Sequence, residues 1–160
     1  MGPESHQVFN QTPPLVGYDV FSADQCLVES ITRMGPESAP ADLTELGRLA
    51  GSAEAQRWGV EANANPPVLR THDRYGNRID EVDFHPSWHR LLEIAIGHGL
   101  HSYPGGPHLT RAAGFYLWSQ VEAGHGCPVS MTYAAVPALR TDPELAAAWE
   151  PLLAALALFG

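Results

Sequence analysis

The chain has 160 residues, 44% of them hydrophobic and 17% charged, which suffices for one domain with its own core or for part of a larger protein. Its 18 acidic and 9 basic residues give a net charge of −9, which argues against a nucleic-acid backbone as the main partner. All the basic residues are arginine, so chemistry that needs a Schiff-base lysine or a P-loop lysine is excluded.

The chain starts with a predicted extended arm, residues 1–21, whose prolines disfavour regular structure. Ser22 and Gln25 form a capping-box pattern, which predicts that the first helix begins there. Gly35, followed by proline, ends that helix. The helical part of the domain is therefore predicted over residues 22–153.

Two further helices are predicted before the paired prolines at positions 66 and 67. In the segment that starts at Ala41, apolar residues recur with the spacing of one helical face: Leu43, Leu46 and Leu49. Ser52 is placed to cap the next helix. We expect that helix to end near Asn63, because the two prolines forbid its continuation.

Residues 68–84 predict a short β-hairpin. The pair Gly76-Asn77 suits a tight turn, since both residue types tolerate positive φ, and β-compatible segments flank it. An isolated hairpin is marginally stable, so we expect it to lean on the helices. Its charged side chains are typical of ion pairs across the strands at a surface, with a ribbon that docks to a partner as the alternative; they are Arg70, Asp73, Arg74, Arg78, Asp80, Glu81 and Asp83.

The second half of the chain is predicted to be almost wholly helical. Pro86 suits the first turn of one helix, and residues 109–123, apolar on most faces, predict a central one. A nearly uncharged helical segment, 129–139, follows. The last helix begins at Thr141–Glu144, where an N-cap, a proline and a capping-box glutamate coincide. The predicted fold class is therefore mainly α, with one short hairpin.

Four histidines invite comparison with zinc sites: His85, His89, His98 and His101. His85 and His89 stand at i and i+4, the spacing of two ligands on one helix. No His-Glu-x-x-His motif is present, and Pro86 takes His85 off the helical face. Capping and surface roles fit these side chains better, so no metal is expected.

Two cysteines, Cys26 and Cys127, are too few for a disulfide scaffold, and we expect free thiols in a reducing cytoplasm. Cys127 lies near His125 in sequence, but a Cys–His nucleophile requires pairing in space, and a small thiol packed at a turn between helices is the plainer interpretation. The first residues show no signal peptide and no apolar run is long enough to span a bilayer, so the expected location is cytoplasmic.

Five motifs, in order along the chain, resemble a single family. They are Val8-Phe9-Asn10-Gln11 with Pro13-Pro14-Leu15, Asn65-Pro66-Pro67-Val68-Leu69, Thr71-His72-Asp73-Arg74-Tyr75-Gly76-Asn77-Arg78, Phe84-His85-Pro86-Ser87-Trp88-His89, and the segment from Gln120 to Ala135. Together they resemble the N-terminal domain of the AidB branch of the acyl-CoA dehydrogenase superfamily, a branch linked to the adaptive response to DNA alkylation damage. The resemblance covers about residues 6–153.

The resemblance implies a helical domain that is followed, in complete family members, by a β-barrel and a C-terminal helical bundle. It also implies FAD held between those two parts, a tetrameric assembly, and oxidation of acyl-CoA substrates with a hydride passed to the flavin. DNA is bound in this branch through the C-terminal region. By analogy, Ser130, Met131 and Thr132 are candidates for the wall of the acyl pocket beside the flavin, with ordinary packing as the alternative.

In this family the flavin-contacting residues, the catalytic carboxylate and the DNA-binding region would lie beyond Gly160. We therefore expect the chain to lack activity and FAD on its own, and to assemble with itself or with the rest of a dehydrogenase. The apolar tail, residues 154–160, differs from the family's exit into the barrel and is typical of a truncated or frameshifted end. A stand-alone interaction module that pairs with a full-length paralogue is the alternative, and a metal enzyme built on the four histidines is a weaker third.

Overall fold

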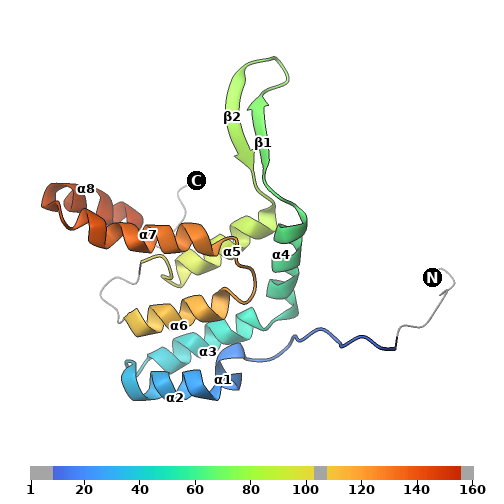
Figure 1. Ribbon diagram of the computed structural model, residues 1–160, viewed down its shortest axis with the longest axis vertical. Coiled ribbons are helices and arrows are strands. Elements are labelled where there is room, and N and C mark those ends of the chain that lie inside the picture. Colours follow the sequence, from blue (N-terminus) through green and yellow to red (C-terminus); the bar gives the residue numbers. More distant parts are fainter. Residues whose placement is uncertain (1–8, 103–107, 156–160) are drawn as a thin grey trace.

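The computed structural model describes residues 9–102 and 108–155, which form a stack of helices with one projecting β-hairpin (Figure 1). The mainly α fold class is confirmed. In chain order the elements are α1 (Val20–Ala23), α2 (Gln25–Met34), α3 (Ala39–Ala50), α4 (Ala53–Ala64), β1 (Val68–His72), β2 (Arg78–Asp83), α5 (Pro86–Gly97), α6 (His108–Trp118), α7 (Gly126–Leu139) and α8 (Pro143–Leu153).

Local capping signals explain where several of these helices begin. The Ser52 side chain accepts a hydrogen bond from the backbone N–H of Ala55 at the start of α4, as predicted. Asp142 likewise caps α8, with Pro143 as the first helical residue. At these two helices the sequence signal and the structure agree.

The predicted capping role of Ser22 is wrong. Ser22 lies inside the short helix α1, and the residue that caps α2 is Asp24, whose carboxylate accepts from the N–H of Leu27 at 3.0 Å. Asp19 caps α1 in the same manner. Two carboxylates at suitable positions thus take the capping roles, because each offers a charged acceptor to unpaired N–H groups at the positive end of a helix.

The core lies where α3 packs against α6, as Figure 1 shows. Leu46 of α3 and Leu117 of α6 are buried there. Trp118 at the end of α6 is also buried, and its indole N–H donates to the carbonyl of Leu91 on α5 at 3.0 Å. The prediction of a central helix is confirmed for α6, because it contacts α3 on one side and anchors α5 through Trp118. The helix ends at Trp118, however, and residues 119–123 of the predicted range are not helical.

The arm leads into this core through α1. Residues 9–17 are exposed, whereas Val20 and Phe21, within α1, are buried against α3. Helical structure thus starts at Val20, inside the segment that the sequence assigned to the arm. The first part of the arm, residues 1–8, and most of the predicted tail, residues 156–160, lie outside the described residues.

The hairpin does not lean on the helices. β1 and β2 pair in antiparallel register, with Leu69 opposite Val82, but both of these apolar side chains are exposed. Figure 1 shows the hairpin standing out from the helices that precede and follow it, α4 and α5. The prediction of packing against the helices is therefore wrong, because the two strands leave the body at the α4 and α5 ends and meet no helical face.

Local interactions hold the hairpin instead. The Asp73 carboxylate accepts from the backbone N–H groups of Tyr75 and Asn77 and from the Asn77 side chain, and these bonds, led by the Asn77 side chain, lower the pKa of Asp73. Gly76 supplies the positive φ of +86° that the turn requires. Arg70 pairs across the strands with Glu81 and Asp83, so the predicted surface ion pairing is confirmed.

Candidate functional site

The start of α7, the helix that carries the predicted wall residues, is held by a buried carboxylate. Glu122 accepts hydrogen bonds from the backbone N–H groups of Gly124 and His125, at 2.6 and 2.9 Å, and from Nδ1 of the His125 ring at 3.0 Å. Burial opposes ionisation of Glu122, but these three donors outweigh it, and the pKa of Glu122 lies below its ordinary value. Glu122 is therefore a charged clamp on the turn before α7.

The His125 ring is hydrogen-bonded to Glu122 and does not activate a nucleophile. Its side chain is buried, and its ring packs edge-on to Trp118 with centroids 6.1 Å apart. Burial lowers the pKa of His125, partly offset by the bond to Glu122. Cys127 is a free thiol that makes no hydrogen bond with His125 in the described chain. Because Cys127 is exposed, the interpretation as a packed thiol is also wrong. The structure thus gives no support to a Cys127–His125 nucleophile.

The wall candidates lie one turn further along α7. Met131 is 66% exposed, whereas Ser130 and Thr132 are half-buried. The hydroxyl of Thr132 donates to the carbonyl of Pro128 one turn earlier, at 2.9 Å, so its hydrogen is used within the helix. Met131 is therefore the most accessible of the three, and a pocket-wall role for Ser130, Met131 and Thr132 stays a prediction.

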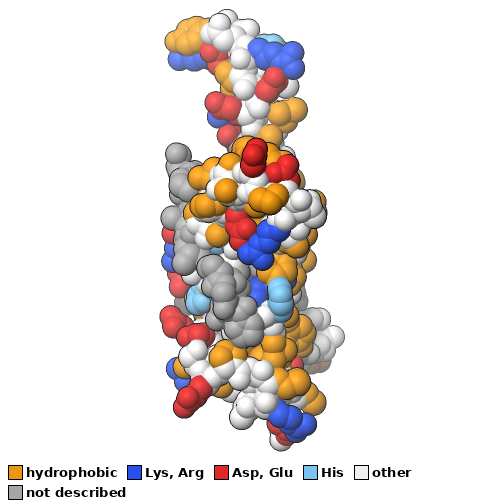
Figure 2. Space-filling view, turned by 90° about the vertical axis from the view of Figure 1, so that its left-hand side faces the viewer, with side chains coloured by type: hydrophobic (Ala, Val, Ile, Leu, Met, Phe, Trp, Pro, Cys, Tyr) orange, Lys and Arg blue, Asp and Glu red, His pale blue; other side chains and the backbone are white. Residues whose placement is uncertain are grey.

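α8 carries an apolar stripe that stays about half exposed in the described part of the chain. Leu145, Trp149 and Leu152 recur at i, i+4 and i+7, and they are 48%, 53% and 54% exposed. We call these three residues the α8 stripe. α8 packs against α7, and an ion pair between Arg140 and Glu150 joins them. Figure 2 shows hydrophobic side chains gathered over this part of the molecule. A surface of this kind is typical of an interface.

The four histidines of the metal hypothesis are spread over different places and roles. His85 caps α5, with Nδ1 accepting from the N–H of Ser87, and His98 lies at the other end of that helix. His101 is buried and bonds through Nε2 to the carbonyl of Ala155. Within residues 9–102 and 108–155, no three His, Cys, Asp or Glu side chains are grouped so that they could hold a metal ion.

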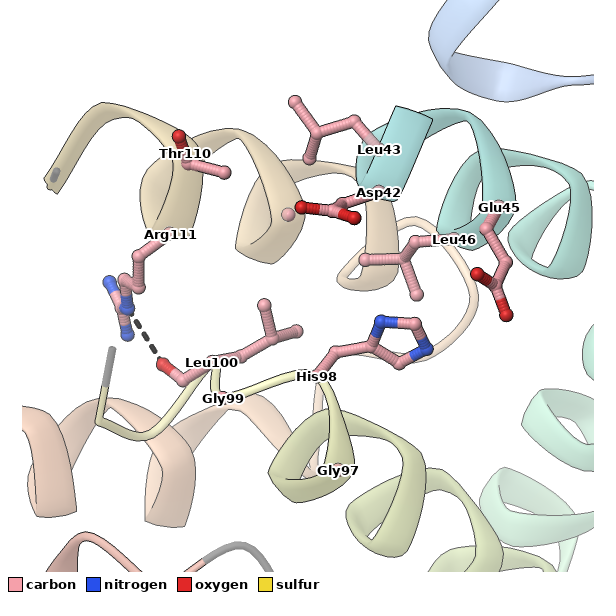
Figure 3. Close-up of a pocket in the computed structure, with 11 residues that line it drawn as sticks. Asp42, Leu43, Glu45, Leu46, Gly97, His98, Gly99, Leu100, Thr110 and Arg111 are labelled. Carbon is pink, nitrogen blue, oxygen red and sulfur yellow. Dashed lines mark hydrogen bonds between the residues drawn. The ribbon is translucent and has the colours of Figure 1, made fainter. Parts of the chain in front are cut away.

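Sequence reasoning did not find one cavity, which is lined by α3, the end of α5 with the residues that follow it, and α6. Figure 3 shows Thr110 and Arg111 of α6 on one side of this cavity and Asp42 and Glu45 of α3 on the other. The four residues lie in separate parts of the sequence and match no motif, so no sequence signal could have paired them. The cavity measures about 360 Å³, the lower end of the range for small-molecule sites.

The residues present do not fit an FAD by themselves. The cavity at α3 and α6 is too small for a dinucleotide, and Ser130, Met131 and Thr132 are consecutive residues of the single helix α7. This surface could contribute one side of a flavin site at most.

Comparison with known proteins gives the family. The sequence matches the family described as the adaptive response protein AidB N-terminal domain over residues 10–157. The chain belongs to this family. It is 39% identical over 142 residues to the putative acyl-CoA dehydrogenase AidB of Escherichia coli strain K12, a match that covers 85% of this chain and 26% of the relative.

Other relatives support the same assignment. Acyl-CoA dehydrogenase family member 11 of Caenorhabditis elegans is 29% identical over 142 residues, which cover 82% of this chain and 23% of that protein. The solved structure called Bd2924 apo-form superposes with a TM-score of 0.81 at 27% identity, over 94% of this chain and 32% of the other. The chain thus spans about a quarter of the length of the curated relatives it matches.

The fold also matches the crystal structure of Caenorhabditis elegans ACDH-11 in complex with C11-CoA, with a TM-score of 0.81 and 24% identity, over 98% of this chain and 29% of the other. At this identity the likeness shows the fold alone. Within the described residues, no helix of this AidB N-terminal domain is long and apolar enough to cross a membrane.

Proposed function

We propose that this chain serves as the N-terminal helical domain of an FAD-dependent acyl-CoA dehydrogenase of the AidB type and is not catalytic on its own. In this proposal it contributes packing and one wall of the acyl pocket, with Ser130, Met131 and Thr132 as the wall residues. The flavin, the catalytic carboxylate and DNA binding belong to other parts of such an enzyme.

The observation that carries the proposal is the exposed apolar surface of two packed helices, which comprises the α8 stripe and Met131 of α7. Burying apolar surface is worth about 25 cal/mol per Å², so three large side chains left half exposed favour an assembly that covers them. The Arg140–Glu150 ion pair ties α8 to α7, so that a partner would meet both helices together. A barrel domain packed on this surface would bring the flavin near α7.

Retention of FAD is the first test. The chain is purified in the presence of excess FAD, passed through gel filtration, and scanned for flavin absorption and acyl-CoA oxidation. We expect no flavin in the protein peak and no turnover, because in this proposal the flavin site belongs to other parts of the enzyme. Stoichiometric flavin in the protein peak would contradict the proposal.

A docking test addresses the surface itself. The chain is co-expressed with a tagged fragment that carries the barrel and C-terminal bundle of the Escherichia coli relative, and the flavin absorption of the fragment shows that it is folded. We expect the two to co-purify and Trp149→Glu to abolish co-purification. Val60→Glu is the matched control, since Val60 is 69% exposed on α4 and lies outside the α8 stripe. Equal co-purification of both variants would rule out docking through α8.

The alternative is a stand-alone interaction module, and the same exposed stripe together with the projecting hairpin favours it. In that case the chain associates with itself or with a full-length paralogue. Light scattering after size exclusion measures its mass, with and without residues 154–160. A monomer in both forms, with no binding to the paralogue, would eliminate the module.

A further inference from the structure

α7 and α8 form one unit that is only lightly buried. In α7 the buried residues are Gly126 and Val129, and α8 has none among its described residues. The two helices pack on each other and are joined by the ion pair between Arg140 and Glu150. Figure 1 shows them side by side, with α5 next to α7. Since a segment with few buried contacts opens at a low cost in free energy, this pair opens more easily than the core helices α3 and α6.

Buried histidines attach this pair of helices to the rest of the chain at both ends. Nε2 of His101 bonds to the carbonyl of Ala155, just after α8, at 3.0 Å. In the turn that leads into α7, the His125 ring bonds to Glu122 and lies edge-on to Trp118 of α6. His101 is 4% exposed and His125 is 2% exposed. Both rings are therefore shielded from water as long as α7 and α8 stay in place.

The His101 ring accommodates one proton only. The carbonyl of Ala155 can only accept, so Nε2 carries the hydrogen of the neutral ring and Nδ1 carries a lone pair. Nδ1 is buried and has no hydrogen-bond partner in the described chain. A second proton would place a cation with an unpaired N–H in the interior, which is costly. Burial accordingly lowers the pKa of His101, partly offset by the bond to Ala155.

His125 also resists a second proton, although it has an acidic neighbour. Its Nδ1 donates to Glu122, so a second proton would go to Nε2 of the same buried ring. Burial lowers the pKa of His125 by more than Glu122 raises it. Opening of the turn would expose the ring to water and restore its ordinary affinity for the proton.

The surrounding charged side chains do not reverse this preference. Glu122 is the charged group that contacts His125. Beside His101, Arg111 of α6 donates to the carbonyl of Leu100 at 2.7 Å, and as a cation it offers no acceptor to a second proton on the histidine. Other ionisable side chains of the packed helices are bound to one another: Arg90 to Glu93, His108 to Tyr133, and Arg140 to Glu150.

We propose that α7 and α8, residues 126–153, form a flap that neutral His101 and His125 hold closed, and that the flap opens as the pH falls from 7 to 5.5. Opening separates Ala155 from His101 and lifts the start of α7 off Trp118, so that both rings take up a proton in water. The flap carries the α8 stripe and the wall candidates, but its opening does not depend on the proposed dehydrogenase role.

Proton uptake sets the size of the effect. A histidine in water has an ordinary pKa of about 6.5. The closed state is therefore favoured above that pH and loses this advantage as the pH falls below it. Between pH 7 and 5.5 the opening constant rises by at most about eightfold for each histidine released, and by at most about 70-fold for both.

Hydrogen exchange of the full chain tests the flap. Exchange is followed by mass spectrometry at pH 7.0 and 5.5 and corrected for the intrinsic rate at each pH. We expect the amides of α7 to be at least about tenfold less protected than those of α3, and their opening constant to rise at least about threefold at pH 5.5. Equal protection of α7 and α3 would mean that α7 opens only when the whole chain unfolds, and would overturn the proposal.

Substitutions show whether the two histidines are responsible. His101→Gln keeps an N–H donor for Ala155 and His125→Asn keeps one for Glu122, but neither new side chain titrates. Each should reduce the rise in α7 exchange and the double variant should abolish it, while His89→Gln, exposed on α5, should leave it unchanged.

Protection of α3 shows that each variant is folded, and the single variants decide if the double variant is not. An undiminished rise in both single variants, or in a folded double variant, would overturn the assignment to His101 and His125.

Discussion

The close contact between α4 and the turn before α7 is possible because Gly59 has no side chain. The variant Gly59→Ala tests this contact. A Cβ at position 59 would lie 2.3 Å from the carbonyl oxygen of Val121 and 3.2 Å from its carbonyl carbon. Both are backbone atoms, so the chain itself must shift. The next residue is Glu122, the clamp on α7, and the displacement would therefore reach the start of the helix that carries the wall candidates.

The magnitude follows from two opposing effects. Overpacking a fitted contact costs about 1–3 kcal/mol, and a fixed carbonyl favours the upper half of that range. Alanine in a helix interior recovers about 1 kcal/mol relative to glycine. The net loss of unfolding free energy is therefore about 1–2 kcal/mol, which for a chain of this length lowers the melting temperature by about 2–8 °C.

The control is Gly97→Ala, because an added Cβ at position 97 meets nothing within 4 Å. The same substitution should there raise the melting temperature slightly, by reducing the freedom of the unfolded chain. Thermal unfolding followed by circular dichroism measures both variants in one buffer. If Gly59→Ala raises the melting temperature as Gly97→Ala does, the close approach of α4 to Val121 is refuted.

Three further outcomes are expected. The free energy of unfolding should fall as the pH drops below about 6.5, because burial lowers the pKa of His125 below its ordinary value of 6.5 and the unfolded chain then binds the proton more tightly. The lowered pKa of Glu122 adds a loss of the same sign below its ordinary value of 4.5. Urea titrations from pH 7.5 to 4 test this. His125→Gln should reduce the slope above pH 5, and the rest comes from His101, whose pKa burial also lowers. Asp24→Ala should lower the free energy of unfolding, measured with urea, by about 1 kcal/mol, and Ser22→Ala should lower it clearly less. The reverse order would show that Ser22, and not Asp24, caps α2. Gly76→Ala should speed amide exchange in the hairpin, because φ at Gly76 is +86° and alanine adopts this conformation only under strain. The melting temperature of the whole chain should stay within about 2 °C, since the hairpin contacts little of the helical body. A larger drop would show that the hairpin supports the core.

The features that the sequence predicted correctly are those set by neighbours along the chain. Ser52 caps α4 and Asp142 caps α8 through bonds to residues two or three positions away. The turn at Gly76 is likewise held by a bond between near neighbours, from the backbone N–H of Asn77 to the carboxylate of Asp73. The wrong prediction at α2 also concerned a local signal. Two neighbouring residues could each cap the helix, and the carboxylate of Asp24 takes the role that was predicted for Ser22.

By itself, the sequence determined the order of the helices, the hairpin and membership of the AidB N-terminal family, because caps, helical periodicity and five motifs are all local patterns. Only the tertiary structure decided which surfaces stay uncovered. It left the hairpin free of the helices, exposed the α8 stripe, and brought residues of α3, α5 and α6 together around a cavity. Burial and unpaired charge depend on what lies nearby in space, and distances along the chain do not specify that.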